Sequence, residues 1–90
     1  MQHFYRDVPG LGHVALSRHA QARAEEERFS EEMVRQALLE PDSPDIPDGH
    51  NVLFRSRGLL RFVINRRPTP FRGASLVTTI IRIKPQARTK

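Results

Sequence analysis

The clearest pattern of apolar and polar positions lies in the second half of the chain, where it has the two-residue period of β-strands. Residues 51–55 and 59–64 are predicted strands, and Ser56-Arg57-Gly58 between them is interpreted as a three-residue hairpin loop. After a polar break over residues 65–73, residues 74–83 are rich in β-branched side chains and predict a long last strand. We therefore expect the second half to form an antiparallel sheet.

In the first half, the apolar positions change to the spacing of helices. Ser17 is a predicted N-cap for a helix over residues 18–28, whose small apolar side chains would allow close approach to a sheet. Ser30 is a second predicted N-cap, followed by two glutamates in the first turn, where the helix dipole favours negative charge. Pro41 ends this second helix near residue 39, because the residue before a proline avoids the helical region.

The remaining segments of the first half predict loops around one short strand. Residues 1–12 are rich in turn-forming residues and are expected to form a loop, whereas the apolar run over residues 13–16 is expected to be a strand. Three prolines within residues 41–50 argue against regular structure there. The predicted order is β-α-α-β-β-β, an α+β fold with two helices packed on an antiparallel sheet.

A chain of 90 residues suits a single domain, with a core over about residues 13–84 and a basic tail over residues 85–90. Cysteine is absent, which excludes disulfides, thiolate metal sites and cysteine nucleophiles. Residues 1–7 lack the apolar run of a signal peptide, and no stretch is long and apolar enough to span a membrane. We expect a soluble cytoplasmic protein that needs no cofactor.

The net charge of +5 conceals a division of the chain into two oppositely charged parts. Residues 1–50 hold all ten acidic residues and five arginines, while residues 51–90 hold ten basic residues and no acidic one. Most of those ten are arginines, whose planar guanidinium groups match phosphates and stack on bases. We favour RNA as the partner; the alternative is that the basic part binds the chain's own acidic half or an acidic protein.

Alternation along the predicted hairpin distributes its arginines between two faces of the sheet. Leu60, Phe62 and Ile64 would share one face, and Arg61 would lie on the other. If the register places Arg55 beside Arg61, the two form a binding platform on an open face. The candidate nucleic-acid-binding residues are Arg28, Arg55, Arg57, Arg66, Arg67 and Arg82.

His19 is the strongest candidate for catalysis that the residues themselves suggest. It would lie in the first turn of the first helix, one turn before Arg23. A neutral imidazole there would accept the proton of a ribose 2′-hydroxyl, and arginines would stabilise the charged phosphorane, so phosphodiester cleavage without metal is one interpretation. The alternative is a histidine that packs between helix and sheet. The other histidines are scattered, and no metal site is expected.

Several short motifs together resemble a known family. They are Ser17-Arg18-His19-Ala20, Arg23, Arg28, Ser30-Glu31-Glu32, Val34, Leu39-Glu40-Pro41-Asp42, Phe54-Arg55, Leu60-Arg61-Phe62-Val63 and Val77-Thr78-Thr79. Over about residues 13–84 the chain is similar to a small uncharacterised domain family that is grouped with RelE/ParE-like and BrnT-like toxins. More widely, that family is grouped with the barnase–EndoU–colicin–RelE ribonuclease fold.

The resemblance implies a RelE-like fold of two helices on an antiparallel sheet and, in many relatives, RNA cleavage without metal. The positions that match the family pattern are His19, Arg23, Arg28, Arg55, Arg61 and Thr79. Among these, His19, Arg23, Arg61 and Thr79 are the candidate catalytic residues. Phe54 stands where relatives often carry tyrosine, and residues 65–73 are longer and more basic than the family pattern.

The favoured hypothesis is a toxin-type endoribonuclease that acts on single-stranded or ribosome-bound RNA. His19 would be its base, with Arg23, Arg55 and Arg61 on phosphate. Two alternatives stay open. One is a non-catalytic phage- or plasmid-type protein that binds a host protein or an acidic antitoxin through its basic sheet. The other is a nucleic-acid-binding module without cleavage.

Overall fold

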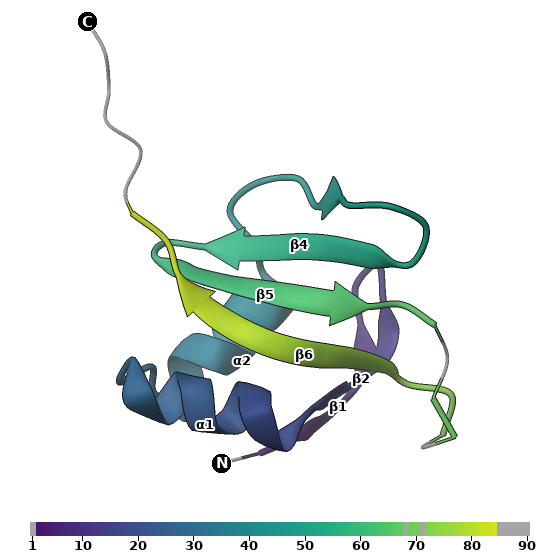
Figure 1. The fold of residues 1–90 in the computed structure, drawn as a ribbon, viewed down its shortest axis with the longest axis horizontal. Coiled ribbons are helices and arrows are strands. Elements are labelled where there is room, and N and C mark those ends of the chain that lie inside the picture. The colour runs from purple at the N-terminus through teal and green to yellow at the C-terminus, as the bar shows by residue number, and fades with distance from the viewer. Residues whose placement is uncertain (1, 68, 71, 85–90) are drawn as a thin grey trace, which may run out of the picture.

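In the computed structural model, which describes residues 2–67, 69, 70 and 72–84, two helices pack on one face of a six-stranded sheet (Figure 1). The helices are α1 (Arg18–Glu26) and α2 (Glu31–Leu39). The strands are β1 (Phe4–Val8), β2 (Gly12–Leu16), β3 (Ile46–Pro47), β4 (Val52–Arg57), β5 (Leu60–Asn65) and β6 (Ser75–Arg82), in the sheet order β1-β2-β6-β5-β4-β3. The predicted α+β class is confirmed. The basic tail predicted over residues 85–90 lies outside the described residues.

Residues 1–12, predicted to form a loop, contain β1, which forms a hairpin with β2. Tyr5 lies opposite Val14, and Val8 lies opposite Gly12. A β-bulge lies between Tyr5 and Val8, with Asp7 in the left-handed region (φ 51°), and it lets both apolar side chains enter the core. The extra residue breaks the two-residue period, so this strand had no recognisable alternation in the sequence.

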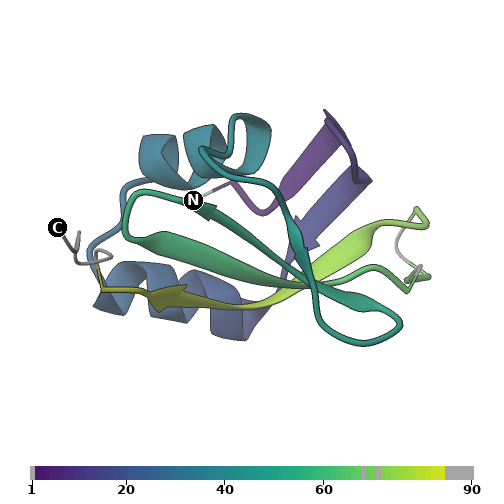
Figure 2. The same cartoon turned by 90° about the horizontal axis from the view of Figure 1, so that it is seen from above.

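The sheet is mixed, because β2 runs parallel to β6. Leu16 pairs with Val77 and Ala15 with Leu76, which joins the first hairpin to the last strand (Figure 2). β4, β5 and β6 pair antiparallel, as expected. The prediction of an antiparallel sheet is wrong for the β2–β6 pair, since local patterns identify strands but do not identify their neighbours.

The β4–β5 hairpin closes with the two-residue turn Gly58-Leu59, and not with the predicted three-residue loop. Arg57 pairs with Leu60, and Gly58 has a positive φ of 61°, as the first position of a type II′ turn requires. The loop predicted over residues 41–50 contains the short strand β3, which pairs with β4 at the sheet edge. Proline is tolerated at such an edge, because a ladder there can lack one N–H.

Both predicted helix N-caps are confirmed. Ser17 Oγ accepts the Ala20 N–H at 3.0 Å and donates to the Thr78 carbonyl at 3.0 Å, so the start of α1 is also tied to β6. Ser30 Oγ accepts the Met33 N–H at 3.1 Å at the start of α2. These serines fix where both helices begin, and one of them fixes α1 against the sheet.

α1 ends at Glu26, two residues earlier than predicted, in a Schellman motif. The Arg28 N–H donates to the Glu25 carbonyl at 3.1 Å, and the Phe29 N–H donates to the Ala24 carbonyl at 2.9 Å. Arg28 lies in the left-handed region (φ 62°), where glycine is preferred at this position. The motif turns the chain so that Phe29 is buried just before α2.

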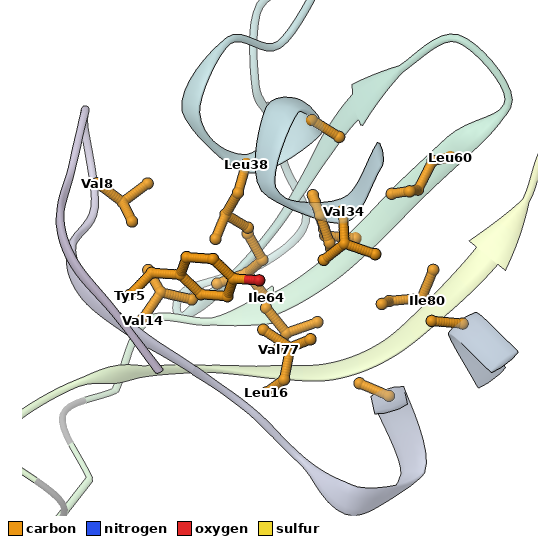
Figure 3. Packing of buried hydrophobic residues seen from close by; sticks show 14 of the residues in the cluster. Tyr5, Val8, Val14, Leu16, Val34, Leu38, Leu60, Ile64, Val77 and Ile80 are labelled. Carbon is orange, nitrogen blue, oxygen red and sulfur yellow. The ribbon is translucent and has the colours of Figure 1, made fainter. Parts of the chain in front are cut away.

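The core lies between the helices and one face of the sheet, which we call the core face (Figure 3). Ala20 and Ala24 are fully buried, which lets α1 approach β6 closely, and Phe62 is the largest fully buried side chain. The buried residues labelled in Figure 3 are Tyr5, Val8, Val14, Leu16, Val34, Leu38, Leu60, Ile64, Val77 and Ile80. Both helices lie on the core face, and we call the other side the open face.

Candidate nucleic-acid interface

The open face consists of the side chains that alternate with the buried ones along each strand. Paired residues on neighbouring strands share a face, so the register identifies its members. One row across the sheet is Phe4, Ala15, Leu76, Asn65 and Val52. Two further rows are Thr79, Val63, Phe54 and Ile46, and then Ile81, Arg61 and Ser56. These rows contain no acidic residue, and most of their side chains are half-buried although no helix covers them in Figure 1.

Two phenylalanine rings on the open face each lie close to an arginine. Arg61 Cζ lies 5.5 Å from the centre of the Phe54 ring, and Arg61 Nε donates to Ser56 Oγ at 2.9 Å. Arg72 Cζ lies 5.5 Å from the centre of the Phe4 ring. The strands β4 and β1 that carry these rings are four strand spacings apart, roughly 19 Å along the sheet. The open face therefore has two separate cation–π pairs.

A third ring, that of His13, extends the Phe4–Arg72 pair. The His13 and Phe4 ring centres are 5.6 Å apart. His13 Nδ1 accepts the Asp7 N–H at 3.3 Å, which fixes the ring beside the β1 bulge. The sequence interpretation missed Phe4 and counted His13 among scattered histidines. The signal that was present is the apolar residues on both sides of Pro9-Gly10, which mark a hairpin.

The acidic residues are concentrated away from the open face. The six glutamates lie in or directly after the helices, and strands β2 to β6 contain no acidic residue. The arginines that form ion pairs within the described ranges are Arg23, Arg35, Arg55 and Arg82. Arg61 and Arg72, on the open face, form no ion pair among the described residues.

Arg55 lies on the core face and not beside Arg61. Arg55 pairs across the hairpin with Phe62, whose side chain is fully buried, whereas Arg61 pairs with Ser56. The prediction that Arg55 and Arg61 share an open face is therefore wrong. The two arginines are separated because the observed register pairs odd-numbered positions of β4 with even-numbered positions of β5.

The contacts of Arg55 show a structural role. Its Nε and Nη2 donate to the two carboxylate oxygens of Asp45 at 2.9 and 2.7 Å, and its side chain is 5% exposed. Its Nη1 donates at 2.8 Å to the Leu38 carbonyl, at the end of α2 where helical carbonyls lack partners. A Cβ on Gly10 would lie 3.1 Å from Arg55 Nη2, so the β1–β2 turn also packs closely on this group. Arg55 is not accessible to a phosphate.

Arg82 and Arg23 share one carboxylate on the core side of the sheet. Arg82 Nε donates to Glu27 Oε1 at 2.8 Å, and its Cζ lies 4.9 Å from the Phe29 ring centre. Arg23 donates to Glu26 at 2.7 Å and to Glu27 at 3.2 Å. The hydrogen bond from Arg82 lowers the pKa of Glu27, and the hydrogen bond to Glu26 raises the pKa of Arg23. The basic strand end thus binds the chain's own acidic helices.

The structure does not bring the four predicted catalytic residues together. His19 is exposed in the first turn of α1, and Arg23 is held by two glutamates on the same helix. Arg61 and Thr79 lie on the open face, with the sheet between them and the helix layer. Because His19 is exposed, the alternative that it packs between helix and sheet is also wrong.

The other predicted nucleic-acid-binding residues lie in three places. Arg66 and Arg67 are exposed directly after Asn65, the last open-face residue of β5, and extend the positive charge of that face. Arg57 donates from the core face to the Glu40 carbonyl at 2.7 Å. Arg28 is exposed in the turn after α1.

Comparison with protein-family models, with curated proteins and with solved structures found no match to this chain. The RelE-like resemblance therefore stays a prediction. Within the described residues, no group of three or more His, Asp or Glu side chains is placed to hold a metal ion. None of the helices in that part of the chain is long and apolar enough to cross a membrane.

Proposed function

We propose that this protein binds single-stranded RNA through the open face of its sheet. The observation that carries the proposal is the pair of phenylalanines, Phe4 and Phe54, each in contact with an arginine that has no ion pair among the described residues. Aromatic rings stack on unpaired bases, and guanidinium groups contact both bases and phosphates. Proteins that bind a single strand without strong sequence preference combine both groups on one surface.

The distribution of charge supports the same partner. Phosphates are repelled by carboxylates, and the helix layer holds all six glutamates while the open-face rows hold no acid. Arg66 and Arg67 continue the positive charge beyond β5. The half-buried apolar side chains between the two phenylalanines offer contact to exposed base faces, which a duplex keeps stacked inside. Single-stranded RNA therefore matches this surface better than a duplex does.

The geometry favours binding over cleavage by the residues chosen from the sequence. His19 lies on the helix layer, and the open-face candidates Arg61 and Thr79 lie on the other side of the sheet. A general base must come within hydrogen-bond distance of the hydroxyl whose proton it takes. RNA on the open face would not meet this condition at His19. The toxin-type endoribonuclease stays the second hypothesis.

The binding proposal is tested by fluorescence anisotropy with a labelled oligouridylate. Phe54→Ala should weaken binding by at least about fivefold, because stacking contributes about 1–3 kcal/mol per base. Arg61→Ala should weaken it as well, since the guanidinium charge is removed from the same place. The matched control is Arg35→Ala, which removes one arginine from the helix layer, where Arg35 pairs with Glu32. Equal affinities for Phe54→Ala and the wild type would contradict the proposal.

Cleavage is tested on the same oligonucleotide and on total RNA. We expect both proteins, wild type and His19→Ala, to leave the RNA intact. Products with cyclic phosphate ends that appear with the wild type and disappear with His19→Ala would support the endoribonuclease hypothesis and place a second RNA site on the helix layer.

A further inference from the structure

A pocket of about 230 Å³ opens on the core side of the sheet, where α2, the β4–β5 turn and the end of β6 meet. Its lining residues are Phe29, Met33, Gln36, Arg57, Gly58, Leu59, Leu60 and Arg82. Arg57, Leu60 and Arg82 form one row across the sheet and share the core face. The pocket is thus separate from the open face, and the RNA proposal makes no use of it.

The apolar part of the pocket is unusually accessible. Met33 is 45% exposed and Leu59 is 37% exposed, and these are two of the three large exposed hydrophobic residues in the described part of the chain. Leu59 occupies a turn position, where polar residues and glycine dominate. Phe29 and Leu60 are buried and form the apolar floor. Exposed apolar side chains gathered around a concave site, and not scattered singly, indicate an interaction site.

The polar part of the pocket is basic. Arg57 donates from Nη1 to the Glu40 carbonyl, and it takes part in none of the ion pairs among the described residues. Arg82 shares its charge with Glu27, which lies outside the lining. Asp42, in the loop after α2, accepts the Gly58 N–H through Oδ2 at 2.8 Å. No acidic residue lines the pocket. The pocket therefore takes its positive charge from Arg57, whose guanidinium forms no ion pair among the described residues.

We propose that this pocket binds an acidic, apolar segment of a partner protein. An apolar side chain of the segment would enter between Met33 and Leu59, and a neighbouring carboxylate would bind the free N–H groups of Arg57. The volume supports a side chain over a small-molecule ligand, because pockets for drug-sized ligands are about 300–1,000 Å³. The charge of Arg57 selects an acidic partner and rejects a basic one.

The test is an NMR titration of the full, ¹⁵N-labelled chain with three synthetic probe peptides. The first is acetyl-Glu-Leu-Phe-Glu-amide, which has both required features. The second replaces its glutamates by lysines, and the third replaces its apolar residues by serines. We expect only the first peptide, at millimolar concentration, to shift the amide signals of Met33, Gly58 and Leu59. No shift with the first peptide, or an equal shift with the second, would overturn the proposal.

Two substitutions test the basic part and the apolar part of the pocket one at a time. Arg57→Gln should weaken binding of the first peptide at least about fivefold, because the charge-assisted hydrogen bonds are lost. Leu59→Ser should weaken it as well, through loss of apolar contact at an exposed turn that tolerates a polar residue. Both variants should keep the amide spectrum of the folded chain and the wild-type RNA affinity. Unchanged peptide affinity in both variants would overturn the proposal and leave the RNA proposal untouched, since Phe54→Ala tests that face alone.

Discussion

Arg55 and Arg61 lie on neighbouring strands of one hairpin, and their surroundings have almost nothing in common. Arg55 is buried on the core face, where Asp45 and the Leu38 carbonyl take its hydrogen bonds. Arg61 lies on the open face over Phe54 and donates to the Ser56 hydroxyl, and it pairs with no carboxylate among the described residues. The same side chain thus serves the fold on one face and is available to a partner on the other.

The difference shows why a count of charges overstates the surface that can bind phosphate. A buried charge is costly unless it is paired, so a buried arginine requires an acidic partner from elsewhere in the chain. Asp45, from the acidic first half, meets this requirement for Arg55, and Glu27 from the same half pairs with the exposed Arg82. On the open face, water solvates the guanidinium groups, and no such partner is needed. The second half is therefore less basic toward a ligand than its composition indicates.

The largest effect that distinguishes the faces is expected for Arg55→Ala. The substitution leaves the Asp45 carboxylate and the Leu38 carbonyl without their donors, so we expect the free energy of unfolding to fall by about 3 kcal/mol. Urea denaturation measures this loss. Arg61→Ala should cost about 1 kcal/mol or less, because it removes one cation–π contact and one hydrogen bond to Ser56 but leaves no carboxylate of the described residues unpaired. Equal losses in the two variants would show that the core-face and open-face arginines contribute equally to the free energy of unfolding.

A second comparison uses the salt dependence of RNA binding. Log affinity falls as log salt concentration rises, and each phosphate contact that is removed makes this negative slope shallower by about 1. We expect this decrease for Arg61→Ala and for Arg72→Ala, and no change for Arg82→Ala, whose guanidinium is engaged by Glu27. The measurement is the anisotropy titration repeated over a series of salt concentrations. A reduced slope for Arg82→Ala would move the interface to the other side of the sheet.

A smaller effect on stability is expected at Arg28, which is neither buried on the core face like Arg55 nor placed on the open face like Arg61. Its left-handed backbone (φ 62°) at the end of α1 suits glycine, so Arg28→Gly should raise the free energy of unfolding by about 0.5–1 kcal/mol. Thermal unfolding measures the gain. Since Arg28 lies on the helix layer, RNA affinity should not change. A loss of affinity would instead make Arg28 part of the interface.

The smallest effect concerns the ion pairs of Glu27. Because hydrogen bonds from Arg82 and Arg23 lower its pKa in the folded chain, Glu27 stabilises the fold above its ordinary pKa of 4.5. This contribution is lost as the pH falls below 4.5 and through the folded-state pKa. Urea midpoints of the wild type and of Glu27→Gln should therefore converge on acidification. A constant difference at every pH would rule out this coupling.

Much of the local structure could be predicted from the sequence, because its causes are local. Ser17 and Ser30 are caps whose partners lie three residues away, and both begin helices where expected. The alternation of Leu60, Phe62 and Ile64 identified the buried side of β5. β1 escaped prediction because its bulge breaks alternation, and the β2–β6 pair because strand neighbours are set by distant segments.

The candidate site was less predictable than the fold. Arg55 and Arg61 were expected to share an open sheet face, and of the two only Arg61 lies on it. Phe4 was missed together with β1, although its ring forms the second cation–π pair with Arg72 and also contacts the His13 ring. Arg55 and Arg82 were expected to bind RNA, but both form ion pairs with acidic residues of the first half. The four predicted catalytic residues lie on opposite sides of the sheet, because helix spacing predicted His19 and Arg23 while nothing in the sequence related that helix to the strand face of Arg61 and Thr79.

The sequence by itself determined the two capped helices, the strands with regular alternation and the separation of acidic from basic segments. Each of these depends on residues a few positions apart. The tertiary structure alone decided which arginines are available, because a strand register shifted by one residue moves every side chain to the opposite face. The alternation in β5 already placed Arg61 on the face opposite to Leu60, Phe62 and Ile64, whereas the burial of Arg55 was decided only by the register of β4 against β5.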